Sequence, residues 1–330
     1  MIEHQEIAYL GHVELGTPKI EESLWFFKEL MGMSEVARDG DSVYLRVWGE
    51  HDLTTLKLTE TPEAGLRHVG WRAMSDAALE RRAKAIEATG QGIGWIDGDV
   101  GHGRAYQFRM PAGHLMEVYW DRELYAAEPG AEPYYKNMAQ NMPSHGAGIR
   151  KIDHLHVLTD DVPANRGFLA DQLGFKLREN IVLDDGREIS SWNSVTPLVH
   201  DIAVSLDAVV GARGRLHHVG WLCDNREDVL RAADIMAANG IFIETGPGKH
   251  KISHQYFMYV YEPGGNRIEL VTQGYLIFEP DWKTVTWTEA DRRDGQAWGL
   301  RMPESFHAYG TPEVDLESAE QREIPIARLG

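Results

Sequence analysis

The sequence predicts an α+β protein of two similar domains, each assembled from two strand–helix–strand units. Two observations lead to this fold class. The chain has 330 residues, enough for two ordinary domains, and its 43% hydrophobic and 25% charged residues are typical of a globular protein. One pattern of histidine, glycine and glutamate also occurs twice along the chain, with its two copies about 150 residues apart. The paired positions are His12 and His154, His68 and His218, and Glu117 and Glu269.

The first unit of each half begins with a strand and then a helix. In the first half, a strand over about 9–15 precedes a helix over about 20–31, because apolar residues recur there at helical spacing. The second half has the matching helix over about 164–173, with Pro163 near its start. Short alternating runs over 42–48 and 189–193 predict strands. The glycines expected just beyond the two helices are Gly32 and Gly174.

The second unit of each half begins with a strand that contains His-Val-Gly-Trp. Ser75 and Asn225 follow these strands and are favourable N-cap residues for a helix. Gly90 and Gly240 are expected to end the two helices. Two further strands close each half, joined by turns at 111–113 and 263–265.

The repeat divides the chain into four parts. We expect an N-terminal domain over 1–122, a linker rich in Pro, Gly and Ala over 123–148, a second domain over 149–275 and a C-terminal tail over 276–330. The tail has no counterpart in the first half, and we expect it to cover the mouth of a site. Its tryptophans are Trp282, Trp287 and Trp298, and its acidic residues 313–323 are expected to form a solvated segment.

Composition excludes several classes of partner. Lys+Arg 33 against Asp+Glu 51 gives a net charge of −18, which disfavours nucleic acid and anionic membranes. Cys223 is the only cysteine, so no intrachain disulfide exists, as is typical of a reducing cytoplasm. The first residues lack the pattern of a secretory signal, and no apolar run approaches the ~18 residues needed to span a bilayer.

Two histidines and one carboxylate, repeated in register, are typical of a non-haem Fe(II) or Mn(II) site with open positions. The competing interpretation is that each histidine satisfies buried hydrogen bonds in the core. His154 and His156 share one face of a strand, so either could be a ligand, and the repeat register favours His154. The same register favours His218 over His217, whose side chain should face the other side of its strand.

The second half carries the additional polar residues that an active site needs. His200, His250 and Tyr259 surround its ligand set, whereas the aligned positions of the first half are Glu50, Gly98 and Gln107. We therefore expect the active metal in the second half. The residues expected to be structural or vestigial are His12, His68 and Glu117.

Several segments together resemble the type I extradiol catechol dioxygenases of the vicinal oxygen chelate superfamily, most closely the catechol 2,3-dioxygenases. The resemblance extends over nearly the whole chain and implies that each domain consists of two βαβββ modules. The segments that carry it are 151–154 (Lys-Ile-Asp-His), 198–201 (Leu-Val-His-Asp), 216–219 (Leu-His-His-Val), 246–250 (Gly-Pro-Gly-Lys-His) and 257–270.

The resemblance implies a role for each site residue. Fe(II), or alternatively Mn(II), would be bound by His154, His218 and Glu269. His200 would act as acid and base, while Tyr259 and His250 would donate hydrogen bonds to the substrate or to intermediates. The implied reaction opens a catechol ring with O₂ beside the diol to give a 2-hydroxymuconic semialdehyde. The family also implies a homotetramer.

The proposed role of Tyr259 requires a specific hairpin. For Tyr259 to lie on the same side as Glu269, the two residues must pair across the strands. A three-residue loop over 263–265 gives that pairing, whereas a two-residue Gly-Gly loop would place Tyr259 on the opposite face. Without the metal ligands, we would interpret Tyr259 as an aromatic residue of the core. His200 and His250 would be interpreted as surface loop residues.

Two features depart from the family pattern or leave the substrate open. His156 stands where relatives often carry Asn, and could retune the pocket or offer another ligand. Arg292 and Arg293 resemble the arginines that hold a substrate carboxylate in homoprotocatechuate enzymes, but Thr245 replaces a further arginine of that group. The two arginines could instead form surface ion pairs with Asp291 or Asp294.

Three other functions compete with catechol cleavage. One is homoprotocatechuate (3,4-dihydroxyphenylacetate) 2,3-dioxygenase activity. Another is a metal-dependent glyoxalase-type isomerase or lyase, which needs no O₂. The third is a binding module without metal, which the complete ligand set and His200 argue against.

Overall fold

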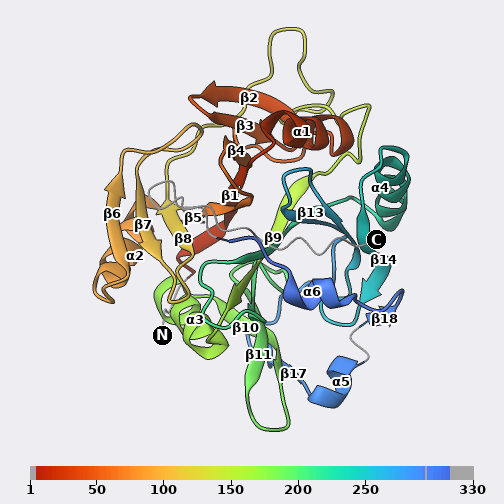
Figure 1. Cartoon of the computed structure of the whole chain (residues 1–330). Coiled ribbons are helices and arrows are strands. Elements are labelled where there is room, and N and C mark those ends of the chain that lie inside the picture. Colours follow the sequence, from red (N-terminus) through yellow and green to blue (C-terminus); the bar gives the residue numbers. More distant parts are fainter. Residues whose placement is uncertain (1–4, 294–295, 313–330) are drawn as a thin grey trace.

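Two twisted sheets form the framework of the molecule (Figure 1). The computed structural model describes residues 5–293 and 296–312. The first sheet has the strand order β2-β3-β4-β1-β5-β8-β7-β6, and the second has the order β17-β10-β11-β12-β9-β13-β16-β15-β14-β18.

The elements of the first half are β1 (Ile7–Thr17), α1 (Ile20–Trp25), η1 (Phe26–Leu30), β2 (Ser34–Asp39), β3 (Ser42–Arg46), β4 (Leu56–Glu60), β5 (Gly65–Ala73), α2 (Asp76–Glu87), β6 (Gly92–Ile96), β7 (Ala105–Arg109) and β8 (Leu115–Tyr119). Those of the second half are β9 (Lys151–Thr159), α3 (Val162–Phe168), η2 (Leu169–Leu173), β10 (Lys176–Val182), β11 (Glu188–Ser194), β12 (Ile202–Leu206), β13 (Leu216–Leu222), α4 (Arg226–Ala238), β14 (Ile243–His250), β15 (Tyr256–Tyr261) and β16 (Arg267–Val271).

Both halves share one topology. In the first, β1 pairs in parallel with β4, β5 pairs in parallel with β8, and the antiparallel pair β1–β5 joins the two units. In the second, β9–β12, β13–β16 and β9–β13 repeat these three pairings. Each half therefore consists of two βαβββ modules, which confirms the predicted fold class.

The helices begin and end where the sequence indicates, with one difference. Ser75 Oγ accepts a hydrogen bond from Ala78 N at 3.1 Å, and Asn225 Oδ1 accepts one from Asp228 N at 3.0 Å, so both side chains cap their helices. The helix predicted over 20–31 divides into the α-helical α1 and the π-helical turn η1, and α3 and η2 repeat this division.

The two halves pack through reciprocal aromatic contacts. The ring of Phe27 in η1 meets Trp221 of β13, with centroids 6.5 Å apart, and Trp71 of β5 meets Phe175, which follows η2, at 5.0 Å. One hydrophobic core extends over both halves. Within the described chain, no helix or named strand lies between Tyr119 and Lys151.

The tail adds edge strands to the second sheet. β17 (Val285–Trp287) pairs with β10, and β18 (Gln296–Trp298) pairs with β14. The helices α5 (Glu289–Arg293) and α6 (Glu304–Ala308) lie beside this sheet (Figure 1). The acidic segment predicted over 313–323 lies outside the described residues. Among the helices that are described, none has the length and apolarity that crossing a bilayer requires.

Candidate metal centre

Three adjacent strands of the second sheet bring His154, His218 and Glu269 together. β13 lies between β9 and β16, and Gly220 is the cross-strand partner of both His154 and Glu269. His154 Nε2 lies 3.0 Å from His218 Nε2 and 2.9 Å from Glu269 Oε2, and His218 Nε2 lies 3.2 Å from the same oxygen. All three side chains are buried.

These separations fit one divalent ion. Ligand atoms at right angles on an ion about 2.1 Å away lie about 3.0 Å from one another. Three such atoms define one face of an octahedron and leave the opposite face open, as in sites with two histidines and one carboxylate. The three atoms of this cluster are separated by 2.9–3.2 Å, so the donor set suits a metal with vacant positions.

A glycine provides the room for this arrangement. A Cβ atom added at Gly220 would clash with the imidazole ring of His154. The first half repeats the feature, because a Cβ at Gly70 would clash with the ring of His12. The glycine of the His-Val-Gly-Trp motif is therefore needed for the close approach of a neighbouring imidazole.

Asp153 orients His154. Its Oδ1 lies 2.8 Å from His154 Nδ1 and also accepts a hydrogen bond from Gln255 Nε2 at 2.8 Å. A carboxylate only accepts, so Nδ1 carries a hydrogen, and a bound cation would displace the second hydrogen and take the lone pair of Nε2 at the centre of the cluster. Burial opposes the charged imidazolium, but the bonds to Asp153 and Glu269 outweigh burial and raise the pKa of His154 to about 9.

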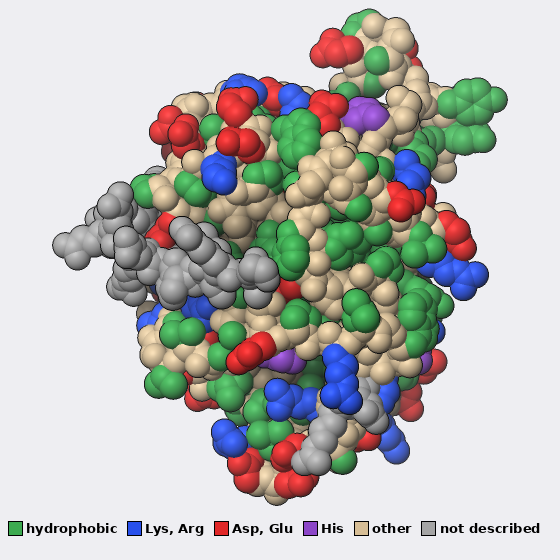
Figure 2. All heavy atoms as spheres, turned by 45° about the vertical axis from the view of Figure 1, so that its right-hand side comes forward, with side chains coloured by type: hydrophobic (Ala, Val, Ile, Leu, Met, Phe, Trp, Pro, Cys, Tyr) green, Lys and Arg blue, Asp and Glu red, His purple; other side chains and the backbone are tan. Residues whose placement is uncertain are grey.

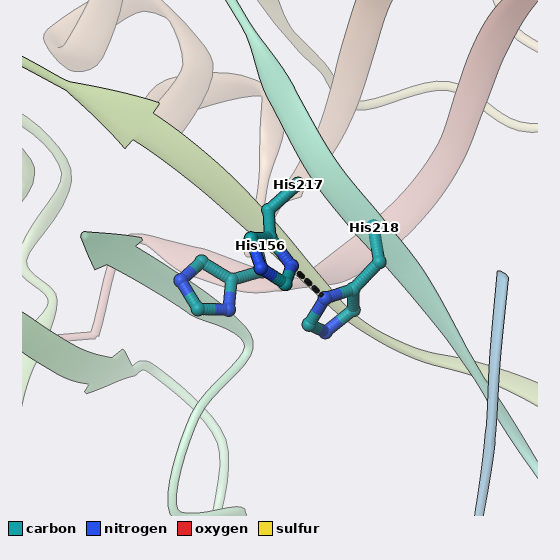
Figure 3. A group of neighbouring side chains, drawn as sticks. All are labelled: His156, His217 and His218. Carbon is teal, nitrogen blue, oxygen red and sulfur yellow. Dashed lines mark hydrogen bonds between the residues drawn. The ribbon is translucent and has the colours of Figure 1, made fainter. Parts of the chain in front are cut away.

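A relay of hydrogen bonds orients His218. The carbonyl oxygen of Phe306 in α6 accepts a hydrogen bond from His217 Nε2 at 2.7 Å, so Nδ1 of a neutral His217 is an acceptor. His217 Nδ1 lies 2.6 Å from His218 Nδ1, which must therefore donate (Figure 3). His218 Nε2 is left with its lone pair facing Glu269. Burial holds the pKa of His217 well below its usual value, consistent with the neutral form.

The prediction that His217 faces away from the site was wrong. The pairing of β13 with β9 shifts between Leu216 and His218, so strict alternation of side chains is interrupted at His217. His217 and His218 consequently both line the same cavity. Alternation alone could not reveal this irregularity, although the adjacent histidines were a signal.

His156 lies beside the hydrogen-bonded pair His217 and His218 (Figure 3). Its Nε2 lies 2.7 Å from Ser205 Oγ, and its ring stacks on His217 with centroids 4.5 Å apart. Since the hydrogen bonds already engage these nitrogens, the cluster needs no ion. The site atom on β9 that faces Glu269 is Nε2 of His154.

The ring of His200 packs against the ring of His154, with centroids 4.1 Å apart. It is buried and lines the cavity. Burial, together with the neighbouring His154, lowers the pKa of His200 well below its usual value. The imidazole is therefore neutral and able to accept a proton from a ligand.

His250 and Tyr259 lie beside the carboxylate. His250 Nε2 is 3.2 Å from the Tyr259 hydroxyl and 3.2 Å from Glu269 Oε1. Tyr259 pairs with Glu269 across β15 and β16, and Glu262 N donates to Asn266 O around a three-residue loop. The predicted hairpin register is confirmed. Burial raises the pKa of Tyr259 well above its usual value, so its hydroxyl remains a donor.

A cavity of about 400 Å³ opens onto these side chains. Figure 2 shows a hollow in which histidine, basic and apolar side chains meet, the same kinds of side chain that line the cavity. The tail contributes Arg292, Met302, Phe306 and His307 to the lining. The tryptophans of the tail lie elsewhere: Trp282 and Trp287 donate hydrogen bonds to β10, and Trp298 meets Tyr256 edge to face.

The remaining predicted residues occupy other places. His12, His68 and Glu117 are buried together in the first half. Thr245 is buried in β14. Asp291 accepts hydrogen bonds from Thr288, not from Arg292. The side chain of Arg293, like Asp294, lies outside the described part of the chain.

Comparisons with known proteins agree with this geometry. Residues 151–270 match the family model of the Glyoxalase/Bleomycin resistance protein/Dioxygenase superfamily, and residues 66–123 match that of the catechol 2,3-dioxygenase-like N-terminal domain. A metapyrocatechase of Geobacillus stearothermophilus is 45% identical over 94% of this chain and 96% of its own. A manganese-dependent 2,3-dihydroxybiphenyl 1,2-dioxygenase of Geobacillus genomosp. 3 is 43% identical, over 89% of this chain and 94% of its own.

The structure of homoprotocatechuate 2,3-dioxygenase from Arthrobacter globiformis superposes with a TM-score of 0.83 and 27% identity, covering 95% of this chain and 94% of that one. The two βαβββ modules of each half, the cluster of two histidines and one glutamate, and these matches lead to one conclusion. The chain belongs to the metapyrocatechase family of extradiol dioxygenases, within the vicinal oxygen chelate superfamily.

Proposed function

We propose that this enzyme cleaves the ring of catechol, or of a substituted catechol, beside its diol with O₂ and gives a 2-hydroxymuconic semialdehyde. The observation that carries the proposal is the geometry of His154, His218 and Glu269 at the base of a cavity that His200 also lines. Both oxygen atoms of O₂ enter the product, so the reaction needs no external reductant.

We propose Fe(II) as the metal and His154, His218 and Glu269 as its ligands. A divalent ion held by this set would polarise the diol and allow electrons to pass from the ring to O₂. Mn(II) suits the same donors, and the relative from Geobacillus genomosp. 3 is named as manganese-dependent. Turnover after loading with each metal separates the two.

The side chains around the ligands supply the proton chemistry. Neutral His200 would take a proton from a substrate hydroxyl and return it when the O–O bond breaks. Tyr259 and His250, on the side of the carboxylate, would hold the substrate oxygens in place. Ile181, Ile189 and Trp192 line the cavity with apolar surface that excludes water.

The decisive experiment compares the wild type with His200→Phe, each loaded with Fe(II) without oxygen and then mixed with catechol and air. Because general acid–base catalysis contributes about 10²–10⁴-fold, turnover should fall by that factor while the bound iron is unchanged. O₂ uptake, the yellow product and iron content are measured together. His51→Phe, at an exposed histidine, is the control. Unchanged turnover in His200→Phe would remove His200 from the mechanism.

One observation favours a second substrate. Arg292 lines the cavity, where its guanidinium could pair with a carboxylate on the ring, as in 3,4-dihydroxyphenylacetate. If the enzyme has a higher kcat/KM for this compound than for catechol, and Arg292→Gln abolishes that preference, the carboxylated compound is the substrate. A hemithioacetal converted without O₂ uptake would instead indicate an isomerase.

The remaining proposals concern organisation. We propose that residues 1–122 form a non-catalytic domain, 123–148 a linker, 149–275 the catalytic domain and 276–330 a tail over the site; the limits of the two sheets and the lining by Phe306 and His307 support this division. We also propose a cytoplasmic homotetramer that acts in the catabolism of aromatic compounds. Light scattering on the purified enzyme tests the tetramer.

A further inference from the structure

The first half contains a buried cluster of three histidines and one glutamate. His12 of β1, His68 of β5, His102 from the segment before β7 and Glu117 of β8 converge, and their side chains are 8%, 8%, 3% and 1% exposed. Glu117 Oε1 lies 3.3 Å from His12 Nε2, 3.8 Å from His68 Nε2 and 3.2 Å from His102 Nε2. The two Nε2 atoms of His12 and His68 are 3.0 Å apart.

Two atoms of this cluster are buried without a partner. His102 Nε2 and Glu117 Oε1 have no hydrogen bond within the described residues, although they face each other. The carbonyl oxygen of Gly103 accepts a hydrogen bond from His102 Nδ1 at 2.8 Å, so the Nε2 of the neutral ring presents a lone pair. Two buried acceptors in contact are unfavourable, and a cation between them would satisfy both.

The cluster also has the supporting shell of a metal site. Glu14 Oε2 lies 2.6 Å from His68 Nδ1, which must therefore donate and leave Nε2 free. Arg67 and Thr59 hold Glu14 in place. The other oxygen of Glu117 accepts a hydrogen bond from Gln107 Nε2 at 3.2 Å.

We propose that the first half binds its own divalent transition-metal ion, of the zinc class, through His12, His102 and Glu117. Four ligands placed tetrahedrally about 2.1 Å from an ion lie about 3.4 Å from one another. Glu117 Oε1 lies 3.3 Å from His12 Nε2 and 3.2 Å from His102 Nε2, close to that value, and the ligand atoms of these three residues all lie within 4.8 Å of one another. Two imidazoles and one carboxylate suit zinc and its neighbours, and a fourth position would be left for water.

This proposal differs from the expectation that His12, His68 and Glu117 are structural or vestigial. That expectation depended on the aligned positions Glu50, Gly98 and Gln107, of which Gly98, aligned with His250, offers no side chain. The structure instead places His102 in the equivalent position, because both His102 and His250 have Nε2 3.2 Å from Oε1 of their glutamate. His102 follows β6 (Gly92–Ile96) on a loop, so its place in the repeat is displaced along the chain.

The test counts metal ions in five full-length proteins. Each is stripped with chelator, loaded with Zn²⁺, separated from free metal and analysed by mass spectrometry for zinc per chain. We expect two ions in the wild type, one in Glu269→Ala, one in Glu117→Ala and none in the double variant. His51→Ala, at an exposed histidine of the same half, should keep two. A Glu269→Ala chain that holds no zinc would overturn the proposal.

A second, milder variant keeps the test informative if Glu117→Ala fails to fold. In the Glu269→Ala background, His102→Gln removes one ligand from a loop, and we expect zinc affinity to fall at least about tenfold by competition with a chromophoric chelator. Circular dichroism checks that the chain is folded. X-ray absorption of zinc in Glu269→Ala should show only nitrogen or oxygen ligands, two of them imidazoles. Unchanged affinity in His102→Gln, or a spectrum with a single imidazole, would contradict the assignment. Ring cleavage plays no part in these readouts, so they are independent of the proposed reaction.

Discussion

At the scale of the residue, His217 determines which nitrogen of His218 faces the candidate metal position. The Phe306 carbonyl requires the hydrogen of His217 on Nε2, and His218 must then donate from Nδ1. A rotated or tautomerised His218 would present an N–H to Glu269 instead of a lone pair. His217 is thus a positioning residue that acts through its neighbour.

Replacing His217 should weaken metal binding more than it weakens the fold. We expect His217→Ala to lower Fe(II) affinity by about 10–100-fold, since loss of a partner that orients a ligand typically has this effect. Anaerobic titration against a competing chelator measures the affinity. His217→Gln, which can still accept from His218, should recover part of it. Equal affinities for the wild type and His217→Ala would show that the relay does not control His218.

The sequence could indicate some of these residues and not others. The repeat register favoured His154 over His156, and Nε2 of His154 faces Glu269 while His156 bonds Ser205. His217 was misplaced because a shift in strand pairing leaves no periodic signal. His102 was missed because its loop displaces it from the repeat register, although its distance to Glu117 matches that of His250 to Glu269.

At the scale of the element, local signals predicted the second helix of each half well. Ser75 and Asn225 cap α2 and α4 as expected. The hairpin of β15 and β16 also has the predicted register, because its loop length determines it. The π-helical turns and the three-residue strands β17 and β18 were not predictable, since they depend on packing against distant strands.

The cap of α4 offers a measurable test of this local control. Asn225→Ala removes the acceptor for Asp228 N, and we expect a loss of about 0.5–2 kcal/mol in the free energy of unfolding. Asn225→Ser, which keeps an acceptor, should stay within a few tenths of a kcal/mol of the wild type. Urea denaturation of the three proteins measures the difference. If the alanine and serine variants were equally stable, the cap would contribute nothing.

At the scale of the whole molecule, the two halves pack against each other through a common interface and are not independent domains. Reciprocal aromatic contacts and one shared core join them. The repeat in the sequence indicated two similar units but carried no information about this interface, because packing between repeats has no periodicity along the chain. Glu50 lies at the interface, near Lys151 and Ile152 of the second half.

Glu50 should make the stability of the molecule depend on pH. Burial raises its pKa from 4.5 to about 8, so the folded chain holds a proton that the unfolded chain releases. The associated stabilisation is complete below pH 4.5 and is lost as the pH rises through 8. Glu50→Gln, which cannot ionise, should raise Tm relative to the wild type more at alkaline than at acidic pH.

Calorimetry across this pH range measures the effect. Glu60→Gln, at an exposed glutamate of β4, is the matched control and should shift Tm equally at every pH. If the Tm difference between Glu50→Gln and the wild type did not change with pH, Glu50 would not be the group whose ionisation lowers the stability.

The hydrogen bond from His217 to the Phe306 carbonyl has a consequence for how the enzyme is made. All three candidate ligands are translated before Phe306, so a prematurely released fragment that ends before this residue carries them without the support that fixes His218. Such fragments should retain iron poorly. Protease nicking between the second sheet and α6 should have the same result in a finished molecule, which links the integrity of the polypeptide to its capacity to keep metal.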